Sequence, residues 1–140
     1  LLAAVGFGAS AWKVAPRDLF IGWTLEQRRD HLHQVIDNAR FLILPWIHSP
    51  NLASHLLARL ARRLPQDWDR RYGYAPVLLE TFVEKARFRG TCYRAANWIH
   101  VGQTQGRGKL DRYKRFAVPV KDVFLLPLRR DFRQRLRAPK

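Results

Sequence analysis

The 140-residue chain contains no methionine and a single cysteine, Cys92. One cysteine excludes a disulfide within the chain and fits a reducing compartment, so we expect a cytoplasmic protein. No apolar run approaches the roughly 20 residues that a membrane-spanning helix needs, which argues against a membrane partner. Because the chain begins with Leu1 rather than methionine, we expect it to be a fragment of a longer protein.

Metal-ligand patterns are also missing from the sequence. His31 and His33 are two residues apart in a helical pattern, so they do not share a helix face. No cysteine or carboxylate cluster accompanies the five histidines, and we therefore expect no metal site.

Acidic residues are scarce, because 11 Asp and Glu stand against 26 Lys and Arg, for a net charge of +15. Such an excess attracts polyanions, and nucleic acid is the first candidate partner. The charge is uneven: from Arg107 to Lys140 the chain has 12 Lys or Arg and 3 Asp, a net charge of +9. We therefore expect the basic binding surface at the C-terminal end.

The first third of the chain predicts two elements. The apolar stretch Leu1–Val14 has the length and glycines of a strand, with a bulge or bend near Gly6 and Gly8. Thr24 and Gln27 form a capping box that starts an amphipathic pattern. This pattern predicts a helix from Leu25 to Asn38.

The next segment predicts a buried strand followed by a helix. The apolar run Arg40–Ile47 is typical of a strand that is covered on both faces. Ser49 as N-cap and Pro50 at the first helical position predict a helix start. We expect Pro65 to end this helix and residues 66–74 to form a polar connector.

Strands are predicted over residues 77–84, 98–104 and 118–126, with a short helix over 91–96 and a terminal helix within 128–136. The alternation of helices and strands predicts an α/β fold: a mixed sheet with crossover helices. We expect one domain over residues 1–126 and a basic C-terminal tail over residues 127–140.

The order strand, helix, strand, short helix, strand resembles the core of the GNAT acyltransferase fold. The resemblance is sharpest at Tyr93–Trp98, where GNAT proteins commonly carry a Tyr, three residues, a Gly and an aromatic residue. Asn97 stands at the glycine position, and asparagine tolerates the left-handed conformation that this cap requires. The resemblance implies that Tyr93 is the general acid for a leaving thiolate. The alternative is a Tyr whose ring packs on the sheet with its hydroxyl hydrogen-bonded.

The same resemblance implies acetyl-CoA or another acyl-CoA as cofactor. Its pyrophosphate would lie at the start of the helix after the strand, on Ser49, Asn51, Leu52 and Ala53. The sequence departs from the GNAT pattern here, because this loop has no glycine and Pro50 removes one N–H donor.

Glu80 interrupts an apolar strand, where a charge must face a cleft, solvent or a partner. It is therefore a candidate general base. The alternative is that Glu80 pairs with one of the many arginines.

Several phrases along the chain resemble the DruA family of bacterial Druantia anti-phage systems. They include Gly6–Trp12, Arg17–Trp23, Asn38–Trp46 and Gly90–Trp98. Similar domains are fused to insertion-sequence transposases. The resemblance implies a role in defence or in a mobile element, with other components of either system as partners.

The glycine-punctuated loop Gln103–Lys109 is followed by basic residues interleaved with Tyr113 and Phe116, a mixture of charge and aromatic residues that contacts nucleic acid. The arginine-rich C-terminal segment is a second candidate for clamping nucleic acid. The alternatives are a solvated loop and a solubilising charged end, in a protein that binds other proteins without catalysis. The predicted phosphate contacts are Arg107, Lys109, Arg112, Lys114, Arg129, Arg130 and Arg133.

Overall fold

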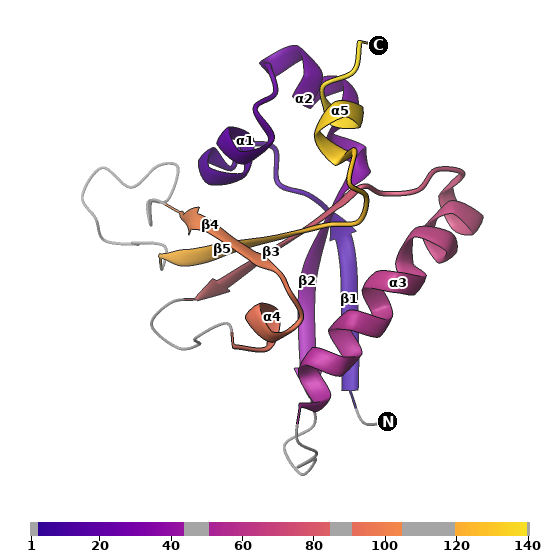
Figure 1. Ribbon diagram of the computed structural model, residues 1–140, viewed down its shortest axis with the longest axis vertical. Helices are drawn as coiled ribbons and strands as arrows, with labels where there is room; N and C mark the ends of the chain where they lie inside the picture. The colour runs from indigo at the N-terminus through magenta and orange to yellow at the C-terminus, as the bar shows by residue number, and fades with distance from the viewer. Residues whose placement is uncertain (1–2, 44–50, 85–90, 105–119, 140) are drawn as a thin grey trace.

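The computed structural model describes residues 3–43, 51–84, 91–104 and 120–139 (Figure 1). In these ranges five strands form one mixed sheet in the order β1-β2-β3-β5-β4. The pair β2–β3 is parallel and the other neighbours are antiparallel. The strands are β1 (Ala3–Ala9), β2 (Val35–Ile43), β3 (Leu78–Glu84), β4 (Ile99–Gln103) and β5 (Lys121–Pro127).

The predicted mixed α/β sheet is thus confirmed, and the register of β1 shifts between Gly6 and Phe7, as its glycines indicated. The short helix and the strand after it also form where the sequence predicted them. The helices are α1 (Ala15–Ile21), α2 (Leu25–His31), α3 (Leu52–Tyr72), α4 (Thr91–Ala95) and α5 (Phe132–Leu136), with a 3₁₀ turn at Leu32–Gln34.

The prediction of one helix over Leu25–Asn38 is wrong in its second half. The capping box of Thr24 and Gln27 forms, but α2 ends at His31 and β2 begins at Val35. Val35 and Ile36 are both buried, and they contribute to the cores on opposite faces of the sheet. Two consecutive buried β-branched residues fit a strand with both faces covered better than one face of a helix.

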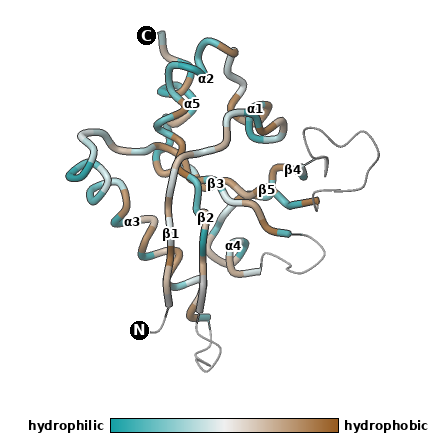
Figure 2. The backbone as a smooth tube through the Cα atoms, turned by 180° about the vertical axis from the view of Figure 1, so that it is seen from behind, coloured by the Kyte–Doolittle hydropathy of each residue, from teal (hydrophilic) through white to brown (hydrophobic). Residues whose placement is uncertain are grey.

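The prediction that Pro65 ends the second helix is also wrong. α3 begins at Leu52 and continues through Pro65 to Tyr72, where Gly73 caps it with a φ of 82°. An interior proline costs one backbone hydrogen bond. Packing offsets this cost, because Leu64 and Trp68, on either side of Pro65, both contact the core. Along its length α3 alternates between apolar and polar residues (Figure 2), as a helix lying on a sheet should.

Two cores lie on the two faces of the sheet. One contains Val35, Leu78 and Leu125 from the strands with Ile21 from α1. The other contains Ile36, Leu79 and Phe124 with residues of α3 and α4. Phe132 and Leu136 of α5 belong to the first core, so the C-terminal segment predicted as a basic tail contributes buried side chains to the fold.

The parallel strands β2 and β3 separate along their length. They pair only where Val35–Asp37 meets Leu78–Glu80, although both strands continue further. Figure 1 shows β3 turning away from β2 beyond this point. α3 is the crossover between the two strands, as a parallel pair requires.

Candidate functional site

A buried ion pair lies at the point where β2 and β3 separate. Arg17 Nη1 of α1 donates to Glu80 Oε1 of β3 over 2.7 Å, and neither side chain has exposed surface. Burial raises the pKa of Glu80, and the Arg17 guanidinium offsets part of that effect. A buried charge is tolerated when it is paired and hydrogen-bonded, and this pair meets both conditions.

The remaining Arg17 donors hold the chain between β1 and α1. Nη1 donates to Ala11 O over 2.7 Å, Nη2 donates to Trp12 O over 3.0 Å, and Nε donates to Asp18. Glu80 Oε2 accepts a hydrogen bond from the Ala11 amide over 3.4 Å. One ion pair therefore joins β3, α1 and the segment between β1 and α1.

Asp37 is a residue of this site that the sequence did not reveal. It is in register with Glu80 on the neighbouring strand, and its Oδ1 is buried without a hydrogen-bond partner in the described structure. Burial and, to a smaller extent, the neighbouring Glu80 raise the pKa of Asp37 to about 7, although Lys121 and Arg17 act in the opposite direction. If the sequence had predicted β2, Asp37 would have been recognised as a carboxylate within a largely apolar strand.

Tyr93 of α4 lies under the other face of the sheet. It is buried, and its hydroxyl donates to Asn38 Oδ1 over 2.6 Å and accepts from Thr81 Oγ1 over 3.5 Å. Burial raises the pKa of Tyr93. Asn97 has the left-handed conformation predicted for it, with a φ of 69°.

Glu80 and Tyr93 are not brought together. Thr81, which contacts Tyr93, follows Glu80 in β3, and consecutive strand residues point to opposite faces. Glu80 pairs with an arginine, which is the alternative to its role as a general base. Tyr93 packs on the sheet with its hydroxyl hydrogen-bonded, which is the alternative to its role as a general acid. Their proposed roles as base and acid stay predictions.

The predicted cofactor residues lie at the start of α3. Asn51 precedes the helix in a left-handed conformation with a φ of 59°, and its side chain makes no capping hydrogen bond. Leu52 and Ala53 begin the first turn, whose N–H groups lack partners within the helix. Ser49 lies outside the described residues.

The predicted phosphate contacts divide into two groups. Arg107, Lys109, Arg112 and Lys114 lie outside the described residues. Of the other three, Arg129 and Arg130 precede α5 and Arg133 lies within it.

Of those three, two are engaged within the protein. Arg129 donates to Asp131 over 2.8 Å, and this bond, with a second from Arg135, lowers the pKa of Asp131 to about 2. Arg133 donates to Phe20 O and lies 4.4 Å from the Phe20 ring centroid. Arg130 is exposed and has no acidic partner among the described residues.

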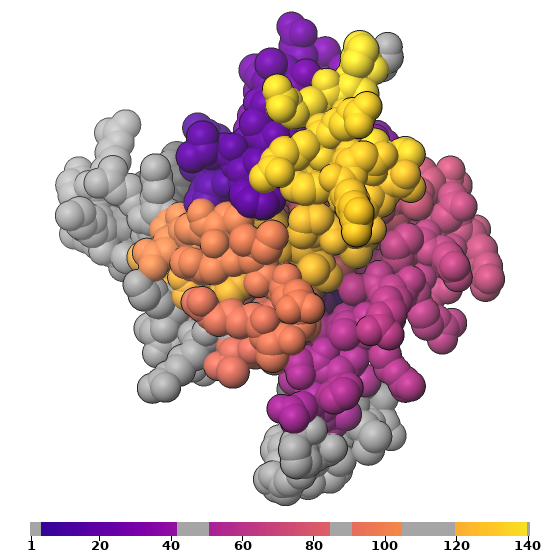
Figure 3. Space-filling view, viewed as in Figure 1, coloured from indigo at the N-terminus to yellow at the C-terminus, as the bar shows by residue number. Residues whose placement is uncertain are grey.

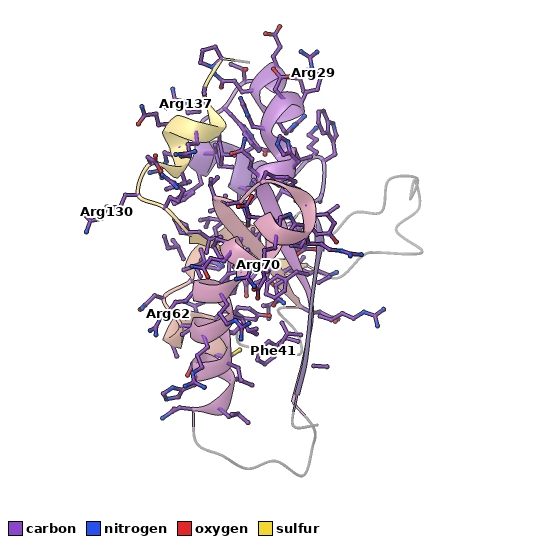
Figure 4. The ribbon with its side chains drawn as sticks, turned by 90° about the vertical axis from the view of Figure 1, so that its right-hand side faces the viewer. Arg29, Phe41, Arg62, Arg70, Arg130 and Arg137 are labelled. Atoms are coloured by element: carbon purple, nitrogen blue, oxygen red, sulfur yellow. The ribbon has the colours of Figure 1, made fainter. Side chains whose placement is uncertain are left out.

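Three exposed arginines from distant parts of the sequence project to the same side of the molecule. Figure 4 shows Arg62 of α3, Arg130 before α5 and Arg137 after α5 along one edge, with Arg29 elsewhere. We call Arg62, Arg130 and Arg137 the arginine face. In Figure 3 the elements that carry it, α3 and the C-terminal segment, adjoin on one surface with α4. Sequence reasoning missed Arg62, because it lies 68 positions before Arg130.

Within the described ranges no group of three or more His, Cys, Asp and Glu residues is placed to hold a metal ion. No helix there is both long and apolar enough to cross a membrane.

Comparison with protein-family models gave a match over most of the chain. The model of the family described as Druantia protein DruA matches residues 1–118. No curated protein matches the chain.

Glu80→Gln should lower the free energy of unfolding by about 3 kcal/mol, because it removes the fully buried counterion of Arg17 and leaves only the partly exposed Asp18 carboxylate beside that charge. Urea unfolding measures this loss. The control is Arg63→Gln, which breaks the exposed pair with Asp67 and should cost under about 1 kcal/mol. Equal effects of the two variants would contradict the importance of the buried pair.

Asp37 should make the protein less stable as pH rises. Between about pH 4 and pH 7 the unfolded chain releases the Asp37 proton while the folded chain keeps it, so the free energy of unfolding falls across this window. Asp37→Asn should remove that slope and raise the melting temperature at about pH 8 by several degrees. Thermal unfolding over a pH series tests this, with the exposed Asp69→Asn as control. A slope unchanged in Asp37→Asn would refute the assignment.

Proposed function

The chain belongs to the DruA family, and on this premise we propose that it serves Druantia anti-phage defence by contacting nucleic acid through the arginine face. The observation that carries the proposal is that Arg62, Arg130 and Arg137 all lie along one side of the molecule (Figure 4). None of the three has an acidic partner in the described structure, so their charges are available to phosphates.

The whole-chain charge supports the same proposal. A net charge of +15 over 140 residues gives long-range attraction to a polyanion. Arg107, Lys109, Arg112 and Lys114 are proposed to add contacts, together with Arg129 and Arg133. A role beside a transposase, or with other components of the defence system, would use the same charge.

We also propose that the fold is GNAT-like. Three features support this: the parallel pair β2–β3 joined by α3, the separation of these strands after Asp37 and Glu80, and the helix–strand unit α4–β4. The left-handed Asn97 supports it as well, because it stands where GNAT proteins commonly place glycine.

A second candidate function is acyl transfer from an acyl-CoA, which the separation of β2 and β3 favours. Three features weigh against it: the missing glycine in the loop before α3, the burial of Tyr93, and the engagement of Glu80 by Arg17. A third is a non-catalytic interaction subunit whose charge only aids solubility. These alternatives are less well supported than nucleic-acid contact.

Binding to a DNA or RNA oligonucleotide should weaken steeply with salt. Replacing Arg62, Arg130 and Arg137 with Gln should reduce the slope of log K against log salt by about 1 for each phosphate contact that is lost. Fluorescence anisotropy at several salt concentrations measures the slope. Arg29→Gln is the matched control, because Arg29 pairs with Asp30 and lies away from the arginine face (Figure 4). Absence of binding at low salt would refute the proposal.

Acetyl-CoA should leave the melting temperature unchanged if nucleic-acid contact is the function. A ligand that binds the folded state at 100 times its dissociation constant would stabilise it by about 2.7 kcal/mol, a shift that thermal unfolding detects readily. A clear increase in melting temperature at millimolar acetyl-CoA would instead favour the acyltransferase.

A further inference from the structure

Trp12, in the segment between β1 and α1, has 49% of its surface exposed. Tryptophan is mostly buried in folded proteins, so a half-exposed indole needs an explanation. Figure 2 shows the segment that carries it, between the labels β1 and α1. Neither the family match nor the arginine face accounts for this side chain.

The backbone around Trp12 is held in place rather than loose. Arg17, which is fully buried, donates to Ala11 O over 2.7 Å and to Trp12 O over 3.0 Å. Glu80 Oε2 accepts from the Ala11 amide over 3.4 Å. The buried ion pair therefore fixes the peptide from which the exposed indole projects, and this lowers the entropy that a ligand must overcome to bind there.

A cation already lies on one face of the ring. The Arg28 guanidinium carbon is 4.3 Å from the Trp12 ring centroid. Arg28 is itself held there, because its Nη1 donates to Asp18 Oδ2 over 2.9 Å. Lys13, the next residue along the chain, is exposed. The site thus combines an oriented aromatic ring with a fixed guanidinium, and an exposed lysine is the next residue along the chain.

We propose that Trp12 and Arg28 form a stacking site for an unpaired nucleobase, so that the protein prefers single-stranded nucleic acid. The inference rests on the proposed nucleic-acid function and adds a ligand class to it. A nucleobase presents a flat π face to an indole or a guanidinium, and its phosphate would meet Lys13. Bases inside a duplex are already stacked on one another, so only a single strand offers them freely.

The test compares a short single-stranded oligonucleotide with a hairpin duplex of the same sequence, by fluorescence anisotropy on the full chain. Trp12→Ala should weaken single-strand binding by about tenfold or more and leave duplex binding unchanged. Trp12→Phe, which keeps an aromatic face, should restore most of the affinity. Leu25→Ala, which removes another exposed apolar side chain (65%), should have no effect. Thermal unfolding verifies that each variant is folded.

The outcomes separate the inference from the function on which it rests. If Trp12→Ala binds like the unmodified protein while the arginine-face variant binds weakly, the stacking site is wrong and nucleic-acid contact stands. If Trp12→Ala weakens single-strand and duplex binding equally, the single-strand preference is wrong. If the unmodified protein binds neither oligonucleotide at low salt, both proposals fail.

Discussion

The ion pair between Arg17 and Glu80 is the constraint on which this site depends. Its charges are fully buried and 63 residues apart in the sequence, so they can meet only when α1 is packed on the sheet. Through the same guanidinium the pair also fixes Ala11 and Trp12. Buried ion pairs are weak evidence for net stability, because desolvation offsets much of the attraction, but breaking one partner is costly. We infer that this pair sets the position of the segment between β1 and α1.

The two faces of the sheet have different roles around this pair. One face carries Arg17 and Glu80, which pair with each other where β2 and β3 separate, and the partly buried Asp37 lies in register beside Glu80. The other face is closed by Tyr93, whose hydroxyl joins β2 and β3 through Asn38 and Thr81. The exposed features that we propose as ligand contacts are the arginine face and the Trp12 ring. Both suit a polyanion with flat bases.

Local signals in the sequence predicted the local structure, and long-range contacts decided the rest. The Thr24 capping box and the left-handed Asn97 could be predicted because each depends on its immediate neighbours. The start of β2 at Val35 was predicted as helix. Val35 and Ile36 are buried by layers on opposite faces of the sheet, and the sequence does not show those layers. Glu80 predicted that a buried charge needed a partner, but nothing in the sequence selected Arg17 among 26 basic residues. The arginine face could not be predicted, since α3 and the C-terminal segment come to lie along one side only in the folded chain.

The central claim is that nucleic acid contacts the arginine face and Trp12. The most direct measurement is a titration of ¹⁵N-labelled protein with a single-stranded oligonucleotide, following the arginine Nε–H and tryptophan indole N–H signals. The account predicts shifts for Arg62, Arg130, Arg137 and Trp12, while the indole of the buried Trp98 stays in place. Shifts that spare these four residues, or that are absent altogether at low salt, would contradict it.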